Sequence, residues 1–106
     1  MNRQEEIIGK IAGLGAAKHP DAEIYLYGSR ARGDAKRLSD WDILFLLDTA
    51  RVSFELETSI MNEFYDLELE TGEVFSPLIY SRSEWNKNHS FSSIYKNIRR
   101  DGIRIK

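Results

Sequence analysis

One nearly continuous apolar run, Trp41 to Leu47, constrains the fold more than any other segment, because only Asp42 interrupts it. Successive side chains of a strand point to opposite faces, so Leu44 and Leu46 share one face while the odd-numbered residues fill the other. Both faces are apolar, which predicts a central strand covered on each side. Asp40 and Asp42 stand two residues apart where this strand begins, so both carboxylates belong to one face.

A second predicted strand, Glu23 to Tyr27, runs directly into Gly28 and Ser29. A glycine at such a turn lets the backbone approach a ligand closely, and the amides after it can donate hydrogen bonds to phosphate oxygens. The Ser29 hydroxyl is a further donor. The chain therefore has a turn suited to phosphate, and ten residues separate its Ser29 from Asp40.

The pair of Asp40 and Asp42 favours a metal ion between its carboxylates, since two like charges so close repel each other. Mg²⁺ prefers oxygen ligands and commonly takes one or two carboxylates together with substrate phosphates. A lone Gly-Ser carries no information, and an isolated Asp-x-Asp is more often a solvated turn. Together, at this spacing and each attached to a predicted strand, they indicate a functional site.

This segment resembles the nucleotidyltransferase superfamily with the fold of the DNA polymerase beta catalytic core. The shared signature is Gly-Ser, about ten residues, then Asp-x-Asp, matched here by Gly28, Ser29, Asp40 and Asp42. The Arg-x-Arg-Gly-Asp continuation at residues 30–34 is typical of the minimal nucleotidyltransferases, relatives of kanamycin nucleotidyltransferase. The resemblance implies an α/β (α+β) fold, with a small mixed β-sheet flanked by helices and a single domain over residues 1–106.

The resemblance also implies a chemistry. Asp40 and Asp42 would be the catalytic residues and the ligands of one or two Mg²⁺ ions, and AMP would pass from ATP to a hydroxyl acceptor. The phosphate-binding residues would be Gly28, Ser29, Arg30 and Arg32. For either arginine, a surface ion pair with Asp34 or another acid is an equal alternative.

A third carboxylate is the point at which this sequence departs from the family. Active members usually carry one on the next strand, yet the predicted strand Val74 to Tyr80 contains no acid. The nearest candidates, Glu68, Glu70 and Glu73, are expected at an exposed helix end. An alternative therefore stays open, in which the protein binds and neutralises a partner without turnover.

The partner is implied by resemblance alone. Minimal nucleotidyltransferases are often paired with a small helical HEPN protein, a ribonuclease toxin, and act as antitoxins by transferring AMP to one of its tyrosines. An antibiotic-modifying enzyme is less favoured, because the chain has 106 residues and the drug site would have to come from another subunit.

Composition agrees with a cytoplasmic location. The chain has no cysteine, no signal-peptide apolar region and no stretch of transmembrane length, so we expect neither disulfides nor a membrane association. The net charge is only −2, and nucleic acid is possible but not favoured.

Charge is unevenly distributed along the chain. Residues 52–81 hold seven acids and no Lys or Arg, whereas residues 82–106 hold seven basic residues and two acids. Solvated helix surfaces explain this pattern, and an acidic face for a basic partner is the alternative.

The remaining sequence predicts further elements. A helical stripe at Ile7, Ile8, Ile11 and Leu14 ends at Pro20. A long helix begins at the cap Ser53 and stops at Gly72, and its expected buried residues are Phe54, Ile60, Met61, Phe64 and Leu67. Pro77 indicates an edge strand or a bulge. The last elements are a helical turn at Glu84 to Lys87, a helix from Ser90 to Arg100 carrying Phe91, Ile94, Tyr95 and Ile98, and a strand at Ile103 to Ile105.

Overall fold

The predicted central strand lies inside a four-stranded sheet of order β3-β2-β1-β4 in the computed structural model, which describes residues 2–106. Strand β1 is antiparallel to β2 and β4, and β3 is parallel to β2, so the sheet is mixed as predicted. The elements in chain order are α1 (Arg3–Lys18), β1 (Glu23–Tyr27), α2 (Ser29–Arg32), β2 (Trp41–Leu47), α3 (Phe54–Thr71), β3 (Phe75–Ser81), α4 (Arg82–Asn88), α5 (Ser93–Asp101) and β4 (Ile103–Arg104).

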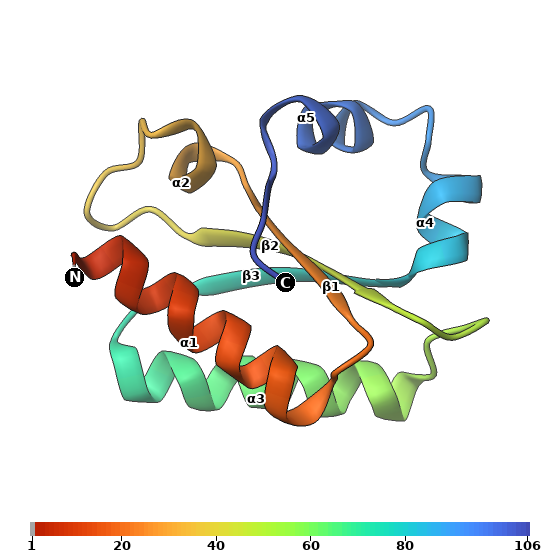
Figure 1. The fold of residues 1–106 in the computed structure, drawn as a ribbon, viewed down its shortest axis with the longest axis horizontal. Coiled ribbons are helices and arrows are strands. Elements are labelled where there is room, and N and C mark those ends of the chain that lie inside the picture. Colours follow the sequence, from red (N-terminus) through yellow and green to blue (C-terminus); the bar gives the residue numbers. More distant parts are fainter. Residues whose placement is uncertain (1) are drawn as a thin grey trace.

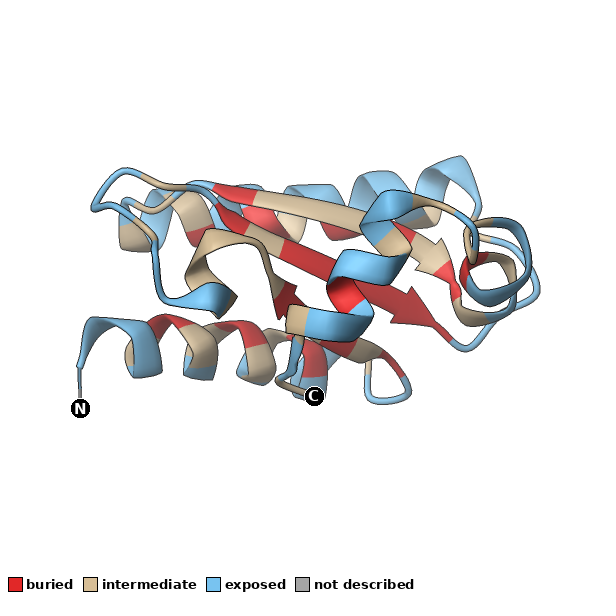
Figure 2. Cartoon of the chain, turned by 90° about the horizontal axis from the view of Figure 1, so that it is seen from above, coloured by how far each residue is buried: buried red, intermediate tan, exposed pale blue. Residues whose placement is uncertain are grey.

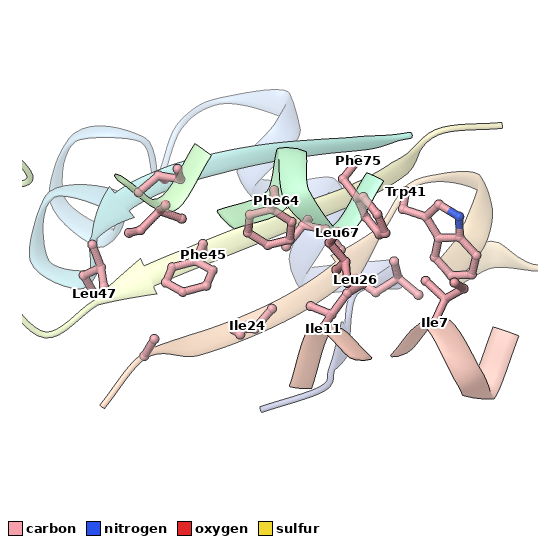
Figure 3. Close-up of a cluster of buried hydrophobic side chains, with 14 residues drawn as sticks. Ile7, Ile11, Ile24, Leu26, Trp41, Phe45, Leu47, Phe64, Leu67 and Phe75 are labelled. Atoms are coloured by element: carbon pink, nitrogen blue, oxygen red, sulfur yellow. The ribbon is translucent and has the colours of Figure 1, made fainter. Parts of the chain in front are cut away.

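Helices cover both faces of the sheet (Figure 1). Helices α1 and α3 pack on one face, and α4 and α5 lie on the other. The short helix α2 follows the end of β1, where its Ala31 packs against the larger core cluster. The larger core cluster, between the sheet and α1 and α3, includes Phe45 and Phe64 with their neighbours (Figure 3). The smaller cluster joins Leu44 and Leu46 to Trp85 of α4 and Ile98 of α5. Strand β2 is therefore buried from both sides, which confirms the prediction from its apolar run.

The two ends of helix α3 are set by the capping residues that the sequence predicts. The Ser53 hydroxyl oxygen accepts a hydrogen bond from the Leu56 amide at 3.1 Å, as expected of an N-cap. Gly72 ends the helix in the left-handed region, with φ of 76°. Both predicted boundaries are confirmed, and α3 then crosses back to place β3 parallel to β2.

Strand β3 lies at the edge of the sheet, which agrees with Pro77 at its third position. Proline lacks an amide hydrogen and is tolerated where that side of the strand has no partner. Because Ser76 is the register partner of Asp42, this edge strand borders the predicted site.

Two apolar side chains that we expected on the buried face of α3 are exposed instead, and so are two of the apolar side chains assigned to the last helix. On α3 the buried core residues are Ile60, Phe64 and Leu67, with partly buried Leu56 packed beside them, so Phe54 and Met61 face solvent. Helix α5 begins three residues later than predicted, so Phe91 falls in the turn before it. The exposed side chains are Phe54 (77%), Met61 (43%), Phe91 (88%) and Ile94 (36%).

A buried tryptophan links the start of β2 to the end of α3. Trp41 Nε1 donates to Glu73 Oε1 at 2.7 Å, and Arg3 Nη2 of α1 donates to Glu73 Oε2 at 3.1 Å. The hydrogen bond from Trp41 and the charge of Arg3 lower the pKa of the Glu73 carboxyl. Glu73 is thus a structural carboxylate that ties three elements together.

Glu73→Gln tests this link. A lowered pKa in the folded state means that ionised Glu73 stabilises the protein above its unfolded pKa, near 4.5, and that this contribution is lost as the pH falls through the folded value. We expect the free energy of unfolding to drop by about 1 kcal/mol at pH 7 and the difference to shrink in acid. Urea titrations at several pH values measure this difference in the free energy of unfolding. The control is Glu57→Gln, a substitution of an exposed glutamate. A difference independent of pH would contradict the assignment.

Candidate active site

The antiparallel pairing of β1 with β2 brings the predicted turn and the predicted carboxylates together. Tyr27, the last residue of β1, is the register partner of Asp42, so Gly28 lies beside the carboxylate of Asp42. Gly28 has φ of 73° and ψ of −156°, a conformation that essentially only glycine adopts. A Cβ atom on Gly28 would also overlap Asp42 Oδ2. Glycine is therefore required here for two separate reasons.

The two carboxylates occupy the face of the sheet covered by α4 and α5. Asp40 is exposed and Asp42 is half-buried. Burial raises the pKa of the Asp42 carboxyl, the negative charge of Asp40 raises it further, and Arg32 opposes both effects. Within residues 2–106, neither aspartate forms an ion pair. Oxygen donors with an unpaired negative charge fit a divalent cation such as Mg²⁺.

A serine stands on β3 beside the carboxylate pair. Ser76 is the register partner of Asp42, and its hydroxyl donates to Asp40 Oδ2 at 3.1 Å. Among the described residues there is no group of three His, Cys, Asp or Glu side chains that could hold a metal ion. The site thus presents two carboxylates and one hydroxyl.

The three glutamates considered as a third carboxylate have other partners. Glu68 accepts from the Phe75 amide at 2.8 Å, Glu70 pairs with Lys10 at 2.5 Å, and Glu73 accepts from Trp41 and Arg3. Trp41 belongs to the core cluster on the face opposite Asp42, so its partner Glu73 is held away from the site.

The turn after β1 leaves its first amides available. Intrahelical bonding in α2 begins with Ala31, whose amide donates to the Gly28 carbonyl at 3.1 Å. The amides of Ser29 and Arg30 precede that bond, as in any helix start. Ser29 is partly exposed at this point. This turn can therefore offer amide and hydroxyl donors to an anion beside Asp42.

The two arginines of the turn lie in different surroundings. The guanidinium of Arg30 sits 4.4 Å from the ring centroid of Trp41 and donates to the Ser39 carbonyl at 2.8 Å. Its side chain is only 13% exposed, so it holds the loop that leads to β2. Arg32 is 47% exposed and pairs with Asp34 at 3.3 Å, the ion pair that was the alternative to phosphate binding.

A recess of about 340 Å³ opens next to the turn, between the end of β1 and α5. Its lining includes Tyr27, Gly28, Arg32 and Asn97. Burial, and then the charge of Asp42, raise the pKa of the Tyr27 hydroxyl to about 12, so this phenol stays protonated at neutral pH. The recess has the size and the donors to receive part of a small polar ligand whose phosphates lie at the turn.

The sequence as a whole matches the family of nucleotidyltransferase domains over residues 8–103. The chain belongs to this nucleotidyltransferase family. The match confirms the family suggested by Gly28, Ser29, Asp40 and Asp42, and with it a nucleotidyl-transfer activity. A comparison with curated proteins finds no match.

Solved structures share the fold of this nucleotidyltransferase. One is a toxin–antitoxin crystal structure with AMP-PNP, with a TM-score of 0.66, 20% identity, and coverage of 93% of this chain and 72% of that one. Another is a mutant of the toxin–antitoxin MntA-HpeT, with the same TM-score of 0.66 and the same coverage at 16% identity.

Within residues 2–106, no helix is long and apolar enough to cross a membrane.

Two features of the site escaped the sequence analysis. Ser76 was part of a predicted strand without an acid, and only the strand register shows that its hydroxyl meets Asp40. Arg30 looked equivalent to Arg32, and only the structure shows it stacked on Trp41. An aromatic residue beside the aspartates was the one available signal for that contact.

Gly28→Ala tests the close approach of the turn to Asp42. Gly33 is a matched control, because its φ is 85° and a Cβ there would meet nothing within 4 Å. We expect Gly33→Ala to lower the free energy of unfolding by about 1–2 kcal/mol and Gly28→Ala to lower it by about 3 kcal/mol. Only Gly28→Ala should weaken Mg·ATP binding, measured by calorimetry. Equal effects of the two substitutions would contradict the contact.

Arg30→Ala and Arg32→Ala separate loop support from ligand binding. We expect Arg30→Ala to destabilise the fold by about 2 kcal/mol, while exposed Arg32→Ala stays within about 0.5 kcal/mol of the native protein. Affinity for Mg·ATP should fall for Arg32→Ala under conditions where it remains folded. Denaturant melts and calorimetry measure the two effects. Unchanged stability of Arg30→Ala would overturn its structural assignment.

Proposed function

We propose that this chain transfers AMP from ATP to a hydroxyl group of a protein partner, a tyrosine of a HEPN-type toxin, and so acts as an antitoxin. One observation carries the proposal: the Gly28-Ser29 turn and the carboxylates of Asp40 and Asp42 lie together on one face of the sheet. The family match supports nucleotidyl transfer. The resemblance to a toxin–antitoxin structure with AMP-PNP, an ATP analogue, supports the nucleotide and the biological setting.

In the proposed reaction the acceptor oxygen forms a bond to the α-phosphorus of ATP. The bond from that phosphorus to the oxygen bridging to the β-phosphate breaks, pyrophosphate leaves, and the hydroxyl proton passes to solvent. Mg²⁺ held by Asp40 and Asp42 would neutralise charge on the phosphoryl oxygens.

The chain's own groups orient the substrate. Gly28 permits the phosphates to approach the backbone, and the Ser29 amide and hydroxyl donate to them. Arg32, which pairs with Asp34 in the structure, would have to exchange that partner in order to offset the phosphates' charge from the exposed side of the turn. The Ser76 hydroxyl, by donating to Asp40, fixes the direction in which that carboxylate presents its oxygens.

A second function is favoured by Ser76. Active relatives are expected to carry a carboxylate on this strand that accepts the acceptor's proton, and here a hydroxyl occupies the position paired with Asp42. A hydroxyl at this position suits a protein that binds nucleotide and toxin but transfers AMP slowly. Such a protein would neutralise the toxin by contact.

Labelled ATP tests the first function. The purified chain and Mg²⁺ are incubated with labelled ATP and the product of the neighbouring gene, and label on that product is measured. We expect Asp40→Asn and Asp42→Asn each to reduce transfer at least about 100-fold, because the charge that stabilises the transition state is lost. Transfer that persists in both variants, or no transfer by the native chain, would refute the proposal.

Ser76→Asp decides between the two functions. If the serine limits turnover, adding a carboxylate beside Asp42 should raise the transfer rate at least about tenfold. The neutral control is Ser76→Asn, which has a similar size and should not raise the rate. If the native chain already uses its two carboxylates efficiently, Ser76→Asp will not accelerate it. Protection of cells by Asp42→Asn would independently favour neutralisation by contact.

A further inference from the structure

Helix α3 exposes an apolar stripe on the side that faces away from the core. Phe54, Met61, Tyr65 and Leu69, with Thr58 between the first two, follow one another at steps of three or four residues, so they share one face of the helix. Their exposed fractions are 77%, 43%, 53% and 70%. Figure 2 shows much of α3 in the colour of exposed residues.

This stripe is separate from the surface by which α3 packs on the sheet. The core side of the helix is formed by Ile60, Phe64 and Leu67, whose exposed fractions are 0%, 2% and 7%. An amphipathic helix normally has a charged or polar opposite face. Here the opposite face is apolar, and several large exposed side chains in a row are typical of an interaction surface.

The charged residues of helix α3 itself are all acidic. Helix α3 carries six acids and no basic residue, namely Glu55, Glu57, Glu63, Asp66, Glu68 and Glu70. A groove of about 600 Å³ adjoins the stripe, and its lining includes Phe54, Glu55 and Asp66 together with Lys18 of α1. Glu63 at this groove already binds His19 at 2.6 Å, whereas Glu55 and Asp66 form no ion pair within the described part of the chain.

We propose that the α3 stripe and its acidic groove dock a partner protein whose surface presents apolar side chains bordered by Lys and Arg. The apolar residues would supply the buried centre of the interface, and Glu55 and Asp66 would pair with the basic border. Two copies of this chain joined through α3 would set their acids against each other. Nucleic acid and anionic membranes are repelled by the same charges.

The position of the stripe separates docking from chemistry. Helix α3 covers the face of the sheet opposite Asp42, so a partner bound there leaves the nucleotide site open. The tyrosine that receives AMP would then come from a second toxin copy or from a segment that extends beyond the docked surface. The inference rests on the proposed function only in taking the toxin as the partner. The test of the docking surface and the test of AMP transfer can therefore give negative results independently of each other.

Binding of the full chain to the product of the neighbouring gene, taken as the toxin in the proposed function, tests the inference, with calorimetry as the measurement. The double variants are Tyr65→Ser/Leu69→Ser and Glu55→Lys/Asp66→Lys. Their matched controls are Phe91→Ser, an 88% exposed apolar residue before α5, and Glu84→Lys on α4, both on the other side of the sheet. We expect each α3 variant to weaken binding at least about tenfold, and the controls to bind like the native chain.

Each outcome decides one question. Native affinity in both α3 variants would overturn the docking surface, whatever the transfer assay shows. Weakened binding without any transfer of label would support the surface while the proposed reaction fails. Sedimentation of the chain alone tests whether the stripe instead binds a second copy. A dimer that dissociates in the Tyr65→Ser/Leu69→Ser variant would assign the stripe to self-association and overturn the inference. Circular dichroism confirms that all variants are folded.

Discussion

The register of β2 is the constraint on which both the fold and the site depend. Adjacent residues serve opposite faces: Trp41 points into the core, where Glu73 and Arg30 hold it, and Asp42 points to the site beside Gly28. A shift by one residue would exchange the two faces and bury a carboxylate. The core that fixes Trp41 therefore also fixes the direction of Asp42, and stability and catalysis share one strand.

The chemistry follows from what surrounds that strand. The pairing with β1 supplies the turn at Gly28 and Ser29, and the pairing with β3 supplies Ser76 in place of an acid. Two carboxylates are oxygen donors of the kind that Mg²⁺ prefers, and the hydroxyl beside them is not a carboxylate base. In the proposed account, the identity of this one side chain on an edge strand decides between an efficient transferase and a slow one.

The sequence was sufficient wherever local chemistry decided the structure. The apolar run Trp41 to Leu47, the cap at Ser53 and the stop at Gly72 all depend on a few neighbouring residues, and all three were predicted correctly. Prediction from the sequence failed where packing between distant segments decides which side chains are buried. Phe54 fits the apolar pattern of α3 yet is 77% exposed, because the core has room only for the face that carries Ile60 and Phe64.

A crystal structure of the chain with Mg²⁺ and AMP-PNP tests the central claim most directly. The account predicts Mg²⁺ within about 2.1 Å of oxygens of both Asp40 and Asp42, phosphates at the amides after Gly28, and Glu73 still bonded to Trp41. A nucleotide bound elsewhere, or a metal ion that recruits Glu73 from the opposite face, would contradict it.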